Sequence, residues 1–200
     1  MSKLNKQNPR LILGSSSPFR KEVLSSLLVP FETSSPDIDE SALEGESPIA
    51  LVERLAIEKA QEVAKSYSDA LIIGSDQVAM HGKKIVGKPH THEVAVEQLR
   101  EASGKKIELF TGLALVDTRS GTVQSEVVPF TVHFKSLSER TIERYLRKER
   151  PYNCAGSVRS EGLGVALFER FDGEDPNALI GLPLIRLIAM LENQGYDLFA

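Results

Sequence analysis

The sequence has one cysteine, no tryptophan and no apolar run long enough to cross a bilayer. A single cysteine, Cys154, excludes an internal disulfide and fits a reducing compartment, where we expect a buried structural thiol. The four histidines show no HExxH or Cys/His spacing, so their pattern does not predict a zinc site. A net charge of -4 argues against a general nucleic-acid binder. We therefore expect a cytoplasmic protein that binds neither membranes nor nucleic acid.

The 200 residues, 41% of them hydrophobic, suffice for one domain with a substantial core, or for one domain pinched into two lobes around a cleft. The polar, basic segment 1–10 resembles neither a signal peptide nor an anchor. We predict that residues 1–10 form a disordered extension and that residues 11–200 form the domain.

The segment around Asp76 is the first candidate for a functional site. Residues 70–73 are apolar and predict a strand buried on both faces, and Gly74 and Ser75 then precede the carboxylate. Ligands of open α/β sheets collect beyond the carboxyl ends of strands, so an Asp at that mouth is a candidate for handling metal or water. A turn in which Asp76 bonds its own backbone is the simpler alternative.

The segment 11–20 has the pattern of a phosphate site. A buried strand at 11–14 leads into Ser15 and Ser17, and Pro18 is suited to the first position of a helix that we expect to reach about Leu28. Free backbone N–H groups, hydroxyls and Arg20 at that helix start could hold a phosphate. An ordinary capped helix with solvated cations would show the same pattern.

The loop 36–41 carries three carboxylates, among them Asp39 and Glu40. Such loops usually cap helices or face solvent, but magnesium also takes one or two carboxylates from a protein. An amphipathic helix is predicted from Pro48 to about Tyr67, and on it Lys59 is spaced for helical ion pairs. Only a tertiary contact would give Lys59 a function.

The rest of the chain alternates between strand and helix signals, which predicts an α/β fold with a mixed sheet. We expect a hairpin over 78–86, a helix from Thr91 to about Gly104, β runs over 106–117 and 122–134 with an interruption at Thr111-Gly112, a helix over 138–148, a loop over 152–164, a strand over 163–171, and a final helix from Asp175 that breaks at Gly181 and Pro183 and resumes over 184–191.

Taken together, these segments resemble the Maf family in order and spacing. The matching motifs are Leu13-Gly14-Ser15-Ser16-Ser17-Pro18-Phe19-Arg20, Asp39-Glu40, Arg54-Leu55-Ala56-Ile57-Glu58-Lys59-Ala60, Ile73-Gly74-Ser75-Asp76-Gln77, Gly87-Lys88-Pro89 and Thr111-Gly112. The resemblance implies a single Maf/ITPase-like domain with helices flanking a mixed β-sheet and two lobes around a central cleft. It also implies a homodimer and a nucleoside triphosphate pyrophosphatase that releases a nucleoside monophosphate and pyrophosphate.

Three positions resemble the branch of the family that acts on 7-methyl-GTP, namely Phe19, Gln77 and Glu161. N7-methylation gives guanine a delocalised positive charge, which favours an aromatic face and a carboxylate. Two positions depart from the branch, because Phe19 stands where its members usually have Trp, and Lys21 stands where many members have a second Arg. Phe is a weaker cation–π partner, and Lys lacks the bidentate fork of Arg.

The resemblance also implies roles for the site residues. Asp76 would act as general base, and Glu40 and Asp76 would hold Mg²⁺ or Mn²⁺. The phosphates would be bound by Ser15, Ser17, Arg20, Lys59 and Lys88. A nucleotide pyrophosphatase of broader specificity, or a non-catalytic nucleotide-binding regulator of septation, are the alternatives.

Overall fold

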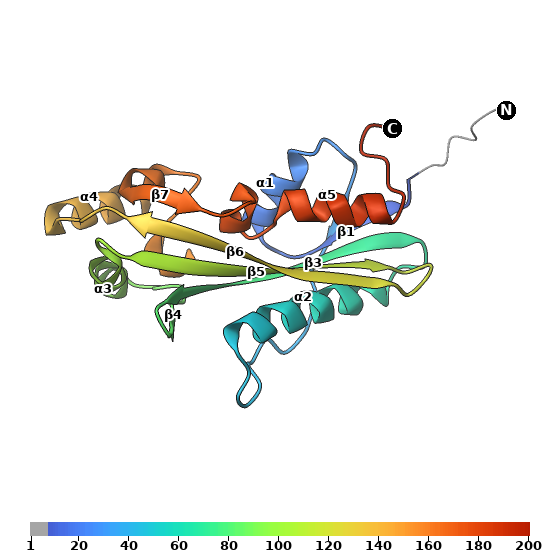
Figure 1. Ribbon diagram of the computed structural model, residues 1–200, viewed down its shortest axis with the longest axis horizontal. Helices are drawn as coiled ribbons and strands as arrows, with labels where there is room; N and C mark the ends of the chain where they lie inside the picture. The colour runs from blue at the N-terminus through green and yellow to red at the C-terminus, as the bar shows by residue number, and fades with distance from the viewer. Residues whose placement is uncertain (1–7) are drawn as a thin grey trace.

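A seven-stranded sheet forms the centre of the computed structural model, which describes residues 8–200 (Figure 1). Its strands are β1 (Arg10–Gly14), β2 (Glu32–Ser34), β3 (Ala70–His81), β4 (Lys84–Ile85), β5 (Lys106–Asp117), β6 (Val123–Phe134) and β7 (Phe168–Asp172). The order is β2-β1-β3-β5-β6-β7, with β4 also paired to β3. Because β1 runs parallel to β2 and β3 while all other pairs are antiparallel, the mixed-sheet α/β prediction is confirmed.

Helices cover both faces of the sheet, with α2 on one face and α1 and α5 on the other (Figure 1). The helices are α1 (Pro18–Ser25), α2 (Pro48–Ala64), α3 (His92–Ala102), α4 (Glu139–Glu149) and α5 (Leu184–Asn193), and the short 3-10 helices are η1 (Ala155–Ser157), η2 (Leu163–Leu167) and η3 (Pro176–Ile180). The hydroxyls of Ser17, Thr91 and Ser138 accept the backbone N–H three residues on, as expected of N-caps.

The pleat of β3 divides its side chains between the two helical layers. Ile72 packs with Ala56 and Ala60 of α2, whereas Leu71 and Ile73 belong to a cluster with residues of α1 and α5. Since successive side chains of a strand point to opposite faces, Gly74 and Asp76 share the α2 face, and Ser75 and Gln77 share the other.

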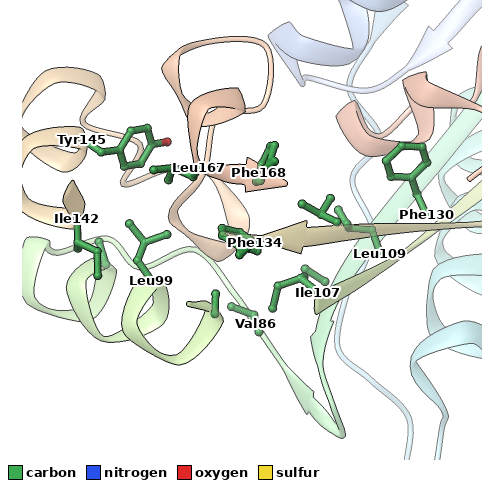
Figure 2. Packing of buried hydrophobic residues seen from close by; sticks show 14 of the residues in the cluster. Val86, Leu99, Ile107, Leu109, Phe130, Phe134, Ile142, Tyr145, Leu167 and Phe168 are labelled. Carbon is green, nitrogen blue, oxygen red and sulfur yellow. The ribbon is translucent and has the colours of Figure 1, made fainter. Parts of the chain in front are cut away.

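A separate hydrophobic cluster fills the end of the sheet that carries α3 and α4. Figure 2 shows its side chains converging from α3, α4, β5, β6 and η2, for example Leu99, Ile142, Ile107, Phe134 and Leu167. This cluster forms one lobe, and the clusters beneath α1, α2 and α5 form the other. The two lobes that the family resemblance implies are thus present.

The structure corrects two expectations about strands. β3 does not end at Asp76 but continues to His81, because ten of its residues pair with β5. Nor is β5 interrupted at Thr111-Gly112, since both residues lie within the β3 and β6 ladders. The small residues in these strands reflect a close approach of α2 and not strand ends.

Element bounds near α1 and β7 also differ from the predictions. The helix that we expected to reach about Leu28 ends at Ser25, and Leu28 itself has a left-handed φ of 57° and is 91% exposed. The predicted strand over 163–171 begins only at Phe168, because residues 163–167 form η2. In α2, Val52 is buried, whereas Leu51 is only partly buried.

Residues 1–7 of the expected N-terminal extension lie outside the described residues. Of the remaining three, Asn8 exchanges two hydrogen bonds with the backbone of Asp197, and Arg10 begins β1. Among residues 8–200, no helix combines the length and the apolar character that a membrane crossing requires.

Candidate active site

All ten residues singled out in the sequence line one cavity of about 750 Å³ between the two lobes. They are Ser15, Ser17, Phe19, Arg20, Glu40, Lys59, Asp76, Gln77, Lys88 and Glu161. They come from α1, α2, β3 and four separate loops, and the volume lies in the usual range for small-molecule sites. The cavity has a charged end around Asp76 and a second end around Phe19 and Glu161.

Asp76 reaches the cavity although it lies in the middle of a strand. The parallel pairing of β1 with β3 stops at Gly14 and Gly74, and β4 pairs with β3 only from Met80 onward. The edge of β3 is therefore open around Asp76, just beyond the carboxyl end of β1. Asp76 thus lies beyond the carboxyl end of a strand, as predicted, but that strand is β1 and not its own strand β3.

Lys59 lies between the two carboxylates at the charged end. Its Nζ is 2.7 Å from Asp76 Oδ1 and 3.0 Å from Glu40 Oε1, and its side chain is only 7% exposed. These are the tertiary contacts that the sequence alone left open. Within the described residues no hydrogen bond engages the second oxygen of Asp76, Oδ2, so that oxygen is the one available to a ligand.

Two glycines let α2 lie close enough for Lys59 to reach Asp76. A Cβ at Gly74 would stand 2.0 Å from the carbonyl oxygen of Ala56, and one at Gly112 would stand 2.1 Å from that of Val52. Real Cβ atoms do not approach backbone this closely, so any side chain at either position would push the helix away.

The turn before α1 keeps its hydroxyl protons free for an anion. Ser15 Oγ accepts from the backbone N–H of Ser17 at 3.1 Å, and Ser17 Oγ accepts from that of Arg20 at 3.3 Å. Neither hydroxyl donates a hydrogen bond within residues 8–200, so both can donate to a phosphate oxygen.

The guanidinium of Arg20 is held in position by a backbone carbonyl and can still bind a ligand. Its Nε donates to the carbonyl of Gly181 at 2.8 Å, which leaves the terminal nitrogens of the guanidinium for a ligand. Burial lowers the pKa of Arg20 below its ordinary value, while the carboxylates of Asp76 and Glu40 act in the opposite direction. The side chain remains a cation at any physiological pH.

Gln77 lines the cavity but also holds η3 against the sheet. Its Nε2 donates to Thr111 Oγ1 at 2.9 Å and to the carbonyl of Ala178 at 2.6 Å, and Thr111 donates to the same carbonyl. The amide N–H groups of Gln77 are thus used in hydrogen bonds to β5 and η3. A role for Gln77 in substrate selection stays a prediction.

Arg159, which sequence reasoning did not identify, contacts two lining residues at the second end of the cavity. The guanidinium carbon of Arg159 lies 5.9 Å from the centre of the Phe19 ring, and its Nε lies 3.3 Å from Glu161 Oε1. The only available signal was a pair of opposite charges two residues apart in a loop. Lys88 is exposed at the cavity wall.

Cys154 also lines the cavity and is half-buried, where the sequence led us to expect full burial. Burial raises the pKa of its thiol above the usual range, and the nearby carboxylate of Glu161 adds to the effect. A raised thiol pKa disfavours the thiolate, which is the reactive form.

Asp76 and Glu40 are the side chains that could contribute to a metal site. Within the described residues, no three His, Cys, Asp or Glu side chains are grouped to hold an ion by themselves. Any ion at this pair would therefore complete its shell with ligand oxygens and water.

The chain resembles known proteins over nearly its whole length. Residues 10–194 match the family described as "Maf-like protein". Proteins named 7-methyl-GTP pyrophosphatase are 53% identical in Colwellia psychrerythraea (95% of each chain), 55% identical in Nitrosococcus oceani (94% of each) and 54% identical in Pseudomonas aeruginosa (95% of this chain and 99% of the relative). Among solved structures, the Staphylococcus aureus Ham1 protein matches with a TM-score of 0.49 at 14% identity, covering 92% of this chain and 99% of that one.

Proposed function

The chain belongs to the Maf family, and on this premise we propose that it hydrolyses 7-methyl-GTP to 7-methyl-GMP and pyrophosphate. Relatives that share more than half of its residues bear the name of that activity. The observation that carries the proposal is the single cavity, which joins a cluster of carboxylates and cations to an aromatic ring and a further carboxylate. A nucleotide with a cationic base has the complementary charges at its two ends.

In the proposed reaction, Asp76 accepts a proton from a water that attacks the α-phosphorus. A new P–O bond forms to that water, the bond from the α-phosphorus to the bridging oxygen breaks, and pyrophosphate leaves with the electron pair. The contact between Lys59 Nζ and Asp76 Oδ1 fixes the orientation of the carboxylate, and Oδ2 can then receive the proton. Such a reaction needs positioning and charge more than a covalent nucleophile.

The phosphates would be held by the cations and hydroxyls at the same end of the cavity. Arg20 and the hydroxyls of Ser15 and Ser17 suit one phosphate group, and Lys59 and the exposed Lys88 suit the others. These contacts position the α-phosphate against Asp76 and stabilise charge that grows on the leaving group.

A divalent cation, Mg²⁺ or Mn²⁺, is part of the proposal. The donor set suits such an ion, because Asp76 and Glu40 supply the one or two carboxylates that magnesium takes beside phosphate oxygens. The position of Lys59 supports this as well, since a positive charge is already accommodated between the two carboxylates. When bound, the ion would neutralise charge on the departing pyrophosphate.

Selection of the base would rest on Phe19 and Glu161. The ring of Phe19 offers a face to the positive charge of 7-methylguanine, and the carboxylate of Glu161 can accept from the N–H edge of the base. A neutral guanine gains less from both contacts.

The test is pyrophosphate release from 7-methyl-GTP, GTP, dTTP and UTP, with magnesium or with EDTA. We expect selective, metal-dependent release from the methylated nucleotide and its loss in Asp76→Asn by roughly a thousandfold. Asp69→Asn is the matched control, because that carboxylate is exposed and lies outside the cavity lining. Equal release from all four nucleotides would leave a broader pyrophosphatase, and nucleotide binding without any release would leave a non-catalytic regulator.

The homodimer that the resemblance implies also belongs to the proposal. Sedimentation of the purified protein tests it, and a mass near that of one 22.0 kDa chain would contradict it.

A further inference from the structure

Arg159 makes the two contacts that the proposed function assigns to the base of the substrate. Its guanidinium lies over the ring of Phe19 at 5.9 Å, within the range of a cation–π contact, and it donates to Glu161 at 3.3 Å. A cation of the protein therefore engages the two side chains that a cationic base would contact.

The main chain of Arg159 is fixed, while its side chain can move. Its backbone N–H donates to the hydroxyl of the buried Tyr145 at 3.0 Å, and its carbonyl accepts from Gly162 and Gly164. The side chain beyond is 43% exposed. Displacing the guanidinium thus requires only rotations of a long, half-exposed side chain.

A second acceptor for the displaced guanidinium lies beside it. Glu149 Oε1 is 3.6 Å from Arg159 Nη1, and the other oxygen of Glu149 accepts from the backbone N–H of Leu163 at 2.7 Å, which holds the carboxylate in place. Arg159 can therefore release Phe19 and Glu161 while remaining paired to Glu149.

We propose that Arg159 competes with the base of the substrate: it engages Phe19 and Glu161 in the free protein and is displaced onto Glu149 when a nucleotide binds. This proposal rests on the proposed function. Every base displaces the same guanidinium, so the competition lowers the affinity for all nucleotides by the same factor. The preference between bases is left to the contacts that each base then makes with Phe19 and Glu161.

The test compares kcat and KM of wild type and Arg159→Gln on 7-methyl-GTP and GTP, together with calorimetric binding of 7-methyl-GMP and GMP. For both nucleotides we expect KM to fall about tenfold, equivalent to about 1.4 kcal/mol, with kcat unchanged, because the competition precedes the chemical step. The ratio of the two kcat/KM values should stay as in wild type, because the competing side chain is the same for both. The two monophosphates should follow the same pattern in binding.

Two further variants separate a local effect from a general one. Arg144→Gln removes the same charge from an exposed position on α4, outside the loop that carries Glu161, and it should leave both KM values unchanged. Arg159→Lys keeps a cation that can cover the ring, so its KM values should stay close to those of wild type.

Several results would overturn the proposal. Loss of kcat/KM on both nucleotides in Arg159→Gln would make Arg159 a direct substrate contact, and unchanged KM values would make it a surface side chain without influence. A KM that falls for one nucleotide only would make Arg159 a selector of bases and refute equal competition. If wild type itself shows no preference for 7-methyl-GTP, the proposed function fails whatever happens to KM in Arg159→Gln. A selective wild type with unchanged KM values in Arg159→Gln refutes the inference alone.

Discussion

Replacing Gly74 by Ala tests how α2 positions the charged end of the cavity. The added methyl group would stand 2.0 Å from the carbonyl oxygen of Ala56 and 2.9 Å from the Cβ of Ala60, whereas ordinary van der Waals contact begins at 3.4 Å. The obstructing atoms are backbone and a short side chain, so no flexible group can give way. Helix and strand must instead separate by about 1.4 Å at this point, an estimate set by the close-packed interior.

That movement affects both stability and activity. Overpacking of this kind costs about 1–3 kcal/mol, and contact with backbone places Gly74→Ala at about 3 kcal/mol. For a domain of this size the loss corresponds to a fall in Tm of roughly 6–12 °C. Because Lys59 is carried by the same helix, its 2.7 Å contact with Asp76 should break. A misplacement of about 1 Å is enough to lower kcat/KM about a hundredfold.

Thermal unfolding and pyrophosphate release measure the two effects. Gly112→Ala should behave alike, because its methyl group would meet the carbonyl of Val52 at 2.1 Å on the same helix. Gly87→Ala is the control for stability, since no atom lies within 4 Å of its Cβ position, and its Tm should stay within about 2 °C of wild type. A Gly74→Ala protein with the Tm and kcat/KM of wild type would refute the reasoning.

Three further predictions concern single side chains. Hydrogen bonds from Arg54, and then from the backbone of Leu43, lower the pKa of Glu46 from 4.5 to about 2. The Tm of wild type should therefore exceed that of Glu46→Gln by its largest amount above pH 4.5, and the difference should vanish as the pH falls toward about 2. Thermal unfolding measured across that range would contradict this if the difference in Tm stayed constant. Ser17→Ala and Ser47→Ala each remove an N-cap, so each should lose about 1 kcal/mol of stability and a few degrees of Tm. Only Ser17→Ala should also raise KM, because Ser47 lies outside the cavity lining. Equal KM values for the two variants would contradict a phosphate contact at Ser17. Cys154 should react slowly with a thiol reagent at neutral pH and faster as the pH rises, because burial raises the pKa of its thiol. Bound 7-methyl-GMP should slow the reaction, because Cys154 lines the cavity. A reaction rate that the nucleotide does not change would contradict the position of Cys154 in the cavity wall.

Signals that act over a few residues were sufficient to predict helix starts. Ser17, Thr91 and Ser138 cap helices as expected, because a cap needs only its own side chain and the next turn of backbone. Strand ends were less predictable. Gly74 and Gly112 look like interruptions in a sequence, but the strands continue through them, because pairing between distant segments and the approach of α2 decide their conformation.

The candidate site, too, could be predicted only in part from the sequence. The family resemblance grouped ten candidate site residues that lie far apart in the sequence, and all ten line the cavity. Arg159 could not be found in this way, because its contact with Phe19 depends on the fold that brings the loop of Arg159 to the start of α1. The hydrogen bond from the Gln77 amide to η3 could not be predicted either, because its acceptor is a backbone carbonyl, which every residue has.

Lys59 is paired with Asp76 and Glu40 before any nucleotide arrives, yet its ammonium group has three N–H donors and, among the described residues, only these two carboxylate partners. A phosphate oxygen can therefore bind Lys59 without displacing either carboxylate. Since both carboxylates stay beside the ammonium group, they also draw on its charge while the product is bound. We therefore expect Lys59 to hold pyrophosphate less tightly than an unpaired lysine would, which favours product release.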